Sequence, residues 1–326
     1  MKPPYPWFGG KARVAAEVWQ RFGKVRNYVE PFFGGGAVLL ARPGYLPEVR
    51  WTETVNDLNG WLCNFWRAVK AAPDQVAEYA ADPVCEMDLH ARGDWLFYRP
   101  GVDADFIERL RSDPEWYDAK SAGWWVWGQS SWIGDNWGRV AHNSRKGEDG
   151  EPCGVVHAGP HLGNSGYGVN RNLPGGGRLD RIRDYMRCLS ERMEDVRVCC
   201  GDWSRVTGPC VTVCHGPTAV FLDPPYAVKD RASVYGEDDS ATLAHAVRAW
   251  AVEAGENPLM RIALCGYEGE HVMPDTWDTW AWKAAGGYAS RNAANENAAR
   301  ERIWFSPACA NNYALPLFDL RGKDTP

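Results

Sequence analysis

Short apolar runs alternate along the chain with longer segments whose apolar residues recur every three or four positions. The clearest run, residues 219–222, reads Ala-Val-Phe-Leu and is followed at once by turn-forming residues. A run of this kind is typical of a strand buried on both faces of a parallel sheet. Comparable runs, which we interpret as further strands, lie at residues 28–33, 49–55, 196–203 and 261–267.

The segments between these runs have the spacing of amphipathic helices. In residues 12–22, for instance, Val14, Val18 and Phe22 recur at four-residue intervals and would share one helix face. Two extended stretches, residues 279–283 and 302–306, suit an antiparallel pair that closes the sheet. The alternation predicts an α/β fold with a mostly parallel sheet. Further helices are expected after the glycines at 34–36 and at residues 61–69, 179–193 and 241–254.

Residues 85–180 break this rhythm and are rich in Trp, Gly, Asn and Arg. We interpret them as an inserted domain, with residues 1–84 and 181–326 forming one α/β domain around it. Most of its tryptophans are expected to fill the insertion's own core, whereas amide and guanidinium side chains can contact base edges. The candidates for nucleic-acid contact are Gln129, Asn136, Arg139, Asn170, Arg171 and Asn172.

Composition narrows the class of protein. The chain has 326 residues, a net charge of −6 and 45% hydrophobic residues, values that are ordinary for a soluble globular protein. No stretch approaches the roughly 20 apolar residues of a membrane span, and the first residues do not have the pattern of a signal peptide. A cytoplasmic location and no membrane partner are therefore expected.

The cysteine pattern favours free thiols. Ten cysteines are present, but without a signal peptide or regular spacing they do not indicate a secreted disulfide framework. The segment that holds Cys199, Cys200, Cys210 and Cys214, with His215 beside it, lacks the paired CxxC spacing of a structural zinc site. We therefore expect no metal.

The run at 219–222 ends in the tetrapeptide Asp223-Pro224-Pro225-Tyr226. The carboxyl end of a parallel strand is where ligands bind in open α/β sheets. A carboxylate, a proline-fixed carbonyl and an aromatic ring suit a planar amine with two N–H donors, such as that of adenine or cytosine. The alternative is a proline-rich turn that ends the strand and buries a tyrosine.

A glycine turn, Gly34 to Gly36, follows the run at 28–33. Glycine lets the backbone approach a ligand closely, and the helix N-terminus behind it favours polar or negative groups. Asp57 follows Gly34 at close to the interval at which nucleotide-binding folds place an acid on the ribose hydroxyls. The alternative function for Asn56 or Asp57 is to cap the next helix.

Four segments in this order resemble motifs of the Dam-type (alpha-group) DNA adenine N6-methyltransferases. They are residues 6–11 (Pro-Trp-Phe-Gly-Gly-Lys), 30–36 (Glu-Pro-Phe-Phe-Gly-Gly-Gly), 56–59 (Asn-Asp-Leu-Asn) and 223–226. The resemblance implies a Rossmann-like methyltransferase fold with an inserted target-recognition domain. It also implies S-adenosylmethionine as cofactor, double-stranded DNA as partner, and a bacterial or phage-encoded enzyme; nothing in the pattern requires a dimer, so a monomer is expected.

Carried over by position, the resemblance assigns roles to individual residues. The catalytic residues would be Asp223, Pro224, Pro225 and Tyr226. The cofactor would be held by Trp7, Lys11, Glu30, Pro31, Phe32, Gly34, Gly36, Asp57, Asp202, Trp203 and Asp223. The insertion does not match the family's recognition segment, so no base contacts carry over.

Other functions remain open at this point. Cytosine N4 also offers two N–H donors, although a serine in place of Asp223 is usual in enzymes of that kind. A flipped adenine could also come from RNA. A DNA-binding regulator that has kept the fold and lost turnover is the alternative from another class, and a dehydrogenase would leave the Pro-Pro-Tyr unit without a function.

Overall fold

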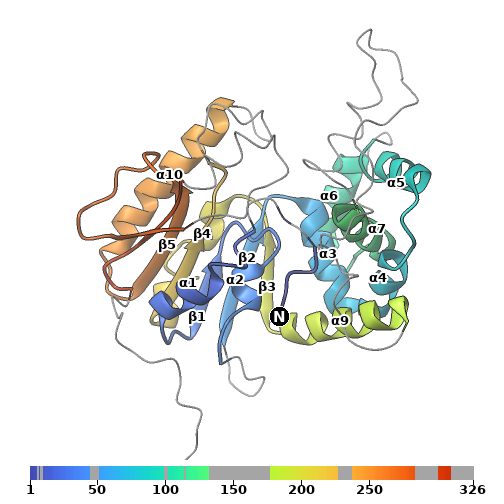
Figure 1. Ribbon diagram of the computed structural model, residues 1–326, viewed down its shortest axis with the longest axis horizontal. Helices are drawn as coiled ribbons and strands as arrows, with labels where there is room; N and C mark the ends of the chain where they lie inside the picture. The colour runs from blue at the N-terminus through green and yellow to red at the C-terminus, as the bar shows by residue number, and fades with distance from the viewer. Residues whose placement is uncertain are drawn as a thin grey trace, which may run out of the picture.

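The computed structural model describes residues 1–5, 7, 10–44, 51–98, 102–113, 115–131, 177–226, 237–282 and 300–309. Within these ranges the chain forms a mixed α/β structure around a seven-stranded sheet with the order β3-β2-β1-β4-β5-β7-β6 (Figure 1). The strands are β1 (Asn27–Glu30), β2 (Thr52–Asp57), β3 (Val196–Cys200), β4 (Thr218–Leu222), β5 (Met260–Tyr267), β6 (Asp278–Ala281) and β7 (Glu301–Phe305).

The sheet has the predicted mixture of strand directions. Strands β1 to β5 are paired in parallel, whereas β7 is antiparallel to both β5 and β6. This confirms the Rossmann-like fold class and the closing antiparallel pair. Strand β1 ends at Glu30, earlier than the apolar run suggested, because Pro31 has no backbone N–H with which to extend the ladder.

Helices cover both faces of the sheet. They are α1 (Ala15–Phe22), α2 (Ala37–Leu40), α3 (Gly60–Ala71) and α10 (Glu237–Gly255), whereas α9 (Arg178–Met193) packs on other helices, α3 among them. Successive residues of β4 alternate between two hydrophobic clusters: Val220 and Leu222 pack with Val247 of α10, whereas Phe221 packs with the cluster that includes α1, α2 and α3. Because β4 is buried on both faces, it needs no polar side, as the run at 219–222 predicted.

A group of helices lies beside the β3 edge, on the side of the sheet away from α10 (Figure 1). It contains α4 (Pro73–Ala80), α5 (Glu86–Phe97), α6 (Val102–Ser112) and α7 (Ala119–Ser131). Trp125 and Trp127 of α7 are buried, as expected for core residues. Trp125, however, packs against Tyr5 and Phe65, at ring-centroid distances of 4.9 and 6.0 Å, so this tryptophan shares a core with residues outside 85–180.

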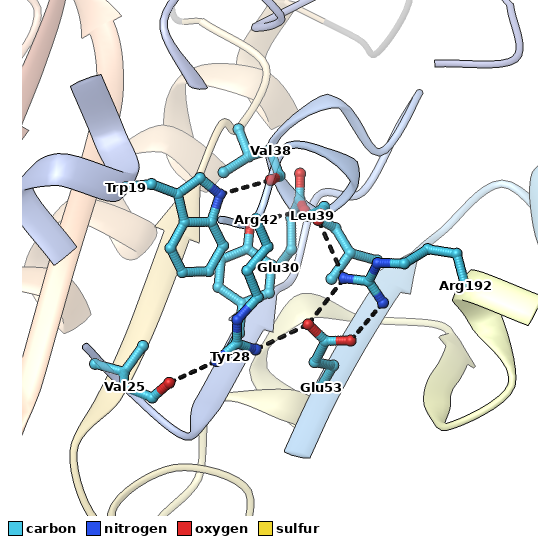
Figure 2. A network of polar contacts seen from close by, with 9 residues as sticks. All are labelled: Trp19, Val25, Tyr28, Glu30, Val38, Leu39, Arg42, Glu53 and Arg192. Atoms are coloured by element: carbon cyan, nitrogen blue, oxygen red, sulfur yellow. Dashed lines mark hydrogen bonds and ion pairs between the residues drawn. The ribbon is translucent and has the colours of Figure 1, made fainter. Parts of the chain in front are cut away.

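A buried ionic network fastens α9 to the sheet (Figure 2). Glu53 of β2 accepts hydrogen bonds from Arg42 at 2.8 Å and from Arg192 of α9 at 2.7 and 2.9 Å. Arg192 also donates to the Leu39 carbonyl at 3.1 Å. All three charged side chains are buried. Helix α9 is thus fixed to β2 and α2 by charge-assisted hydrogen bonds.

None of the helices in the described ranges is both long enough and apolar enough to cross a bilayer.

Candidate active site

An ion pair joins the amino-terminal motif to the tetrapeptide after β4. Lys11 Nζ lies 2.9 Å from Asp223 Oδ2, and the side chains are 4% and 21% exposed. Burial by itself lowers the pKa of Lys11, but the nearby acidic groups, Asp223 foremost, outweigh this and raise it above its usual value. Lys11 therefore stays charged and holds one carboxylate oxygen of Asp223.

Tyr226 lies between two carboxylates. Its hydroxyl is 2.9 Å from Glu301 Oε2 and 3.2 Å from Asp223 Oδ1. Its ring meets the ring of Tyr267 edge-on, with centroids 4.7 Å apart. Burial, together with the charges of Asp223 and Glu301, raises the pKa of Tyr226 well above its usual value, so the phenol keeps its proton.

The remaining residues of the tetrapeptide differ in exposure, because Pro224 is buried and Pro225 is half-buried. Cys265, on the neighbouring strand β5, is fully buried, and burial raises the pKa of its thiol well above its usual value. Sequence reasoning did not identify Glu301 or Cys265. Glu301 opens β7 and Cys265 lies within β5, and both come beside Tyr226 and Asp223 only through the packing of the sheet.

The glycine turn adopts the left-handed conformation that its composition predicts. Gly34 has φ +48° and Gly36 has φ +69°. A Cβ at Gly34 would lie 2.4 Å from the Trp7 indole nitrogen, and one at Gly36 would lie 2.7 Å from the Phe33 ring. The missing side chains therefore leave room for the two aromatic rings, and Trp7 lies directly against the turn.

Asp57 is bound to this glycine turn. Its carboxylate accepts hydrogen bonds from the amides of Gly34 and Asn59, both at 2.9 Å. Burial raises the pKa of Asp57, although the hydrogen bonds from Asn59 and Gly34 act in the opposite direction. The helix-cap alternative is wrong for Asn56 and Asp57, because Asn59 caps α3 by accepting from the amides of Trp61 and Leu62.

Asn56 joins the ends of three strands and was missed as a site residue. Its side-chain amide donates to the Pro31 carbonyl, after β1, at 3.1 Å and to the Gly201 carbonyl, after β3, at 2.9 Å. Since Asn56 itself belongs to β2, one buried amide fixes the relative positions of three loops. The sequence signal for Asn56 is an amide at the end of a buried strand, but the sequence pattern indicates the adjacent Asp57 as the functional residue.

Asp202 and Trp203 lie at the carboxyl end of β3. Asp202 is exposed and caps the short 3-10 helix η1 (Trp203–Val206) by accepting from the Ser204 amide at 2.9 Å. The Trp203 ring stacks on Phe32, with centroids 6.3 Å apart and planes inclined by 26°. Both rings are half-buried, so an aromatic pair lines the edge of the sheet between the β1 and β3 loops.

Glu30 ends β1 and is buried. Its carboxyl group accepts a hydrogen bond from the Tyr28 hydroxyl at 2.8 Å; Figure 2 shows the two side chains side by side. Burial raises the pKa of Glu30 well above its usual value, and the charges of Asp223 and Asp57 add to the effect. The buried site therefore favours the neutral form of Glu30 more than water does.

The cysteines in the described ranges are free thiols, and no three His, Cys, Asp or Glu side chains in those ranges are arranged to hold a metal ion. Cys63 and Cys200 line a cavity of about 480 Å³ together with Arg67, Lys70 and Tyr117. A hydrogen bond with the Cys63 thiol lowers the pKa of Cys200.

The expected DNA contacts fall mostly outside the described residues. Gln129 lies on α7 and is half-buried. The other candidates, Asn136, Arg139, Asn170, Arg171 and Asn172, lie outside the described residues.

Part of the chain is similar in sequence to known proteins. Residues 7–95 match the family model of the D12 class N6 adenine-specific DNA methyltransferases. The Type II methyltransferase M.MjaIII of Methanocaldococcus jannaschii is 25% identical over 126 residues, which cover 34% of this chain and 43% of that protein. The match thus spans less than half of the relative's length. The part of the chain that carries Lys11, the glycine turn and Asp57 is therefore similar to the D12 class N6 adenine-specific DNA methyltransferases.

Proposed function

We propose that the protein transfers a methyl group from S-adenosylmethionine to the N6 amine of adenine in double-stranded DNA, as a Dam-type enzyme. One observation carries this proposal: the ion pair of Lys11 and Asp223. Lys11 lies in the segment that matches the D12 class, and Asp223 opens a tetrapeptide that lies outside it. Two motifs with complementary chemistry thus meet at the carboxyl edge of one sheet, where α/β enzymes bind their ligands.

The residues at this edge fit S-adenosylmethionine. A carboxylate has about four lone-pair sites, so Asp57 can accept from ribose hydroxyls as well as from the Gly34 and Asn59 amides. The half-buried ring of Trp203, with Phe32 and the exposed Asp202, would flank the cofactor's adenine. The turn residues Gly34 and Gly36 would border its methionine portion, with Trp7, Lys11, Glu30 and Pro31 around them. When bound, S-adenosylmethionine supplies an electrophilic methyl group on a positively charged sulfur.

The tetrapeptide would hold the target amine. An adenine inside a duplex cannot reach a buried methyl donor, so the base would be flipped into the site at a cost of a few kcal/mol. Asp223 and the Pro224 carbonyl would accept the two amine protons, and Tyr226 would contact the ring. These hydrogen bonds make the nitrogen lone pair more available and stabilise the positive charge that forms on it. Catalysis would rest mainly on positioning and electrostatics.

Lys11 has a definite function in this scheme. Its ammonium group occupies Asp223 Oδ2 at 2.9 Å, so the carboxylate is fixed in direction before a base enters. A fixed acceptor needs no reorganisation during the reaction, which is the advantage of a preorganised site. The carboxylate of Asp223, whose side chain is partly exposed, would face the incoming amine.

Adenine is favoured over the other substrates by the comparisons. The matched family is specific for adenine N6 in DNA, which argues against cytosine N4 and against RNA. The intact tetrapeptide and the charged Lys11 favour an active enzyme over a silent DNA-binding regulator. We also propose that residues 85–180 form the target-recognition domain, with residues 1–84 and 181–326 forming the catalytic domain.

Substitution of Asp223 tests the proposal. The Asp223→Ala variant should lose methyl transfer to unmethylated genomic DNA while it largely keeps its affinity for S-adenosylmethionine, measured by titration calorimetry. The Asp223→Asn variant retains the side-chain volume and should also lose methyl transfer, which separates loss of the carboxylate from loss of the folded structure. Asp74→Asn, which changes an exposed carboxylate paired with Arg187, is the matched control and should transfer methyl normally. Normal turnover in Asp223→Ala would exclude the proposed function of Asp223.

A further inference from the structure

One phenolic proton lies between two carboxylates at the candidate site. The Tyr226 hydroxyl is 2.9 Å from Glu301 Oε2 and 3.2 Å from Asp223 Oδ1. Hydrogen bonds between two oxygens are usually about 2.5 to 3.0 Å long, so only the contact with Glu301 falls in that range. The Tyr226 proton is thus donated to Glu301, and the contact with Asp223 is the weaker of the two.

Glu301 is held in place by the pairing of β5 and β7. It is the first residue of β7, is 5% exposed, and lies opposite Tyr267 in the antiparallel register. Tyr267 in turn packs edge-on against the Tyr226 ring. The same pair of strands therefore fixes both the acceptor of the Tyr226 hydroxyl and the wall against which its ring rests.

The direction of this hydrogen bond decides what Asp223 can accept. Lys11 already occupies Asp223 Oδ2 at 2.9 Å, so Oδ1 is the oxygen left for a further donor. If the Tyr226 proton were donated to Oδ1, it would compete with an amine proton of the target base. Because the hydroxyl donates to Glu301 Oε2 at the shorter distance, its proton is directed away from Asp223 Oδ1.

We propose that Glu301 is a positioning residue for methyl transfer. It accepts the hydroxyl proton of Tyr226, orients the ring, and keeps Asp223 Oδ1 available to the amine. This inference rests on the proposed function, because the amine is the substrate group named there. The Tyr226 hydroxyl contacts both carboxylates, so the hydroxyl is the point at which the inference can be tested.

The test is a double-mutant cycle between Glu301 and the Tyr226 hydroxyl. A glutamine amide can donate to Tyr226, which would turn the phenolic proton toward Asp223; Glu301→Gln should therefore lower kcat about tenfold, the effect of one hydrogen bond. Its dissociation constant for S-adenosylmethionine should stay within about twofold of the wild-type value. In the Tyr226→Phe background, where no hydroxyl is present, Glu301→Gln should change kcat by less than about threefold.

The control is Glu268→Gln, which removes an exposed carboxylate paired with Arg302 at the same edge of the sheet and should leave kcat unchanged. If Glu301→Gln does not fold, judged by its thermal transition, the cycle is repeated with Glu301→Asp, whose shortened acceptor should produce a smaller loss that also disappears in Tyr226→Phe. Equal losses with and without the hydroxyl would overturn the inference and leave the proposed function intact. Absence of methyl transfer by the wild type would instead overturn the proposed function, and the inference with it.

Discussion

Lys11 and Asp223 form a 2.9 Å ion pair in which the lysine is almost completely buried. Lys11 precedes α1, and Asp223 follows β4, so the contact closes the candidate site across segments far apart in the sequence. A buried ammonium group is costly unless it is paired, and Asp223 provides that pairing. The same contact therefore serves folding and prepares the carboxylate for a substrate.

Replacement of Lys11 by methionine should affect both properties. Without its partner, the 21% exposed Asp223 loses a hydrogen-bond donor, and we expect the free energy of unfolding to fall by about 1–3 kcal/mol. Methyl transfer should fall by about tenfold or more because the carboxylate loses its fixed direction. Urea unfolding and steady-state kinetics measure the two effects, with exposed Lys24→Met as the control. Equal stability and turnover in Lys11→Met and Lys24→Met would contradict the assigned function of Lys11.

Gly34 and Gly44 provide a matched pair of substitutions. Both have positive φ, +48° and +65°, so alanine costs about 1–2 kcal/mol of backbone strain at either position. At Gly44 nothing lies within 4 Å of an added Cβ, whereas at Gly34 the Trp7 indole nitrogen would be 2.4 Å away. We expect only Gly34→Ala to displace Trp7 and weaken S-adenosylmethionine binding. Titration calorimetry of the two variants checks this, and equal affinities would show that the indole does not border the cofactor.

The buried ion pairs of Glu53 with Arg42 and Arg192 should contribute more to the free energy of unfolding than an exposed ion pair of α9 does. In Glu53→Gln, two buried arginines lose their shared counter-charge, so the free energy of unfolding should fall by about 3–5 kcal/mol. The ion pair of Asp74 and Arg187 is exposed, and Asp74→Asn should shift the thermal midpoint far less. Thermal unfolding of both variants makes the comparison, and shifts of similar size would mean that the buried network contributes no more than a surface pair.

Stability should depend on pH through His271, which is buried and packs edge-on against Trp304. Burial, followed by the charges of Arg248 and His245, lowers its pKa from 6.5 to about 4. The unfolded chain thus binds the proton at a higher pH than the folded protein does. The stabilisation that neutral His271 provides is fully present above about pH 6.5. As the pH falls toward 4, the free energy of unfolding decreases by at most about 3 kcal/mol.

The His271→Phe variant should remove this dependence, since phenylalanine has no proton to bind. The difference in unfolding free energy between wild type and variant, measured in urea, should be constant above pH 7 and change steadily between pH 6.5 and 4. A difference that does not vary with pH would exclude His271 as the source.

Much of the fold follows from the sequence pattern because buried parallel strands leave a direct signal. The run at 219–222 needed no knowledge of its neighbours to be identified as β4, and the closing pair at 279–283 and 302–306 became β6 and β7. Strand ends were harder to predict. β1 stops at Glu30 because the next residue is a proline, although the apolar run continues to residue 33.

Some residues of the candidate site could be predicted from local motifs, whereas others could not. Lys11, Asp57 and Asp223 lie in local motifs, so the sequence identified them, and the structure brings Lys11 to Asp223 and Asp57 to the glycine turn. Glu301 lies in no such motif, and Asn56 lies in the motif at residues 56–59 without a function assigned to it there. A single glutamate at the start of β7 gains its function only from the strand pairing that brings it to Tyr226.

The insertion shows a further limit of local patterns. Its tryptophans indicated a separate core, but burial is decided by tertiary packing, and Trp125 fills space between Tyr5 and Phe65 instead. A contact between residues of distant segments leaves no trace in the spacing of either segment. The same holds for the capping of α3: Asn59 occupies the N-cap position, whereas Asn56 and Asp57 lie in β2 and make other contacts.

The most direct test is the transfer of labelled methyl from S-adenosylmethionine to unmethylated genomic DNA, followed by nucleoside digestion and mass analysis. We expect N6-methyladenine from the wild type and none from Asp223→Ala, with both proteins binding the cofactor. Cofactor binding without label in DNA, or label in N4-methylcytosine, would contradict the proposed function.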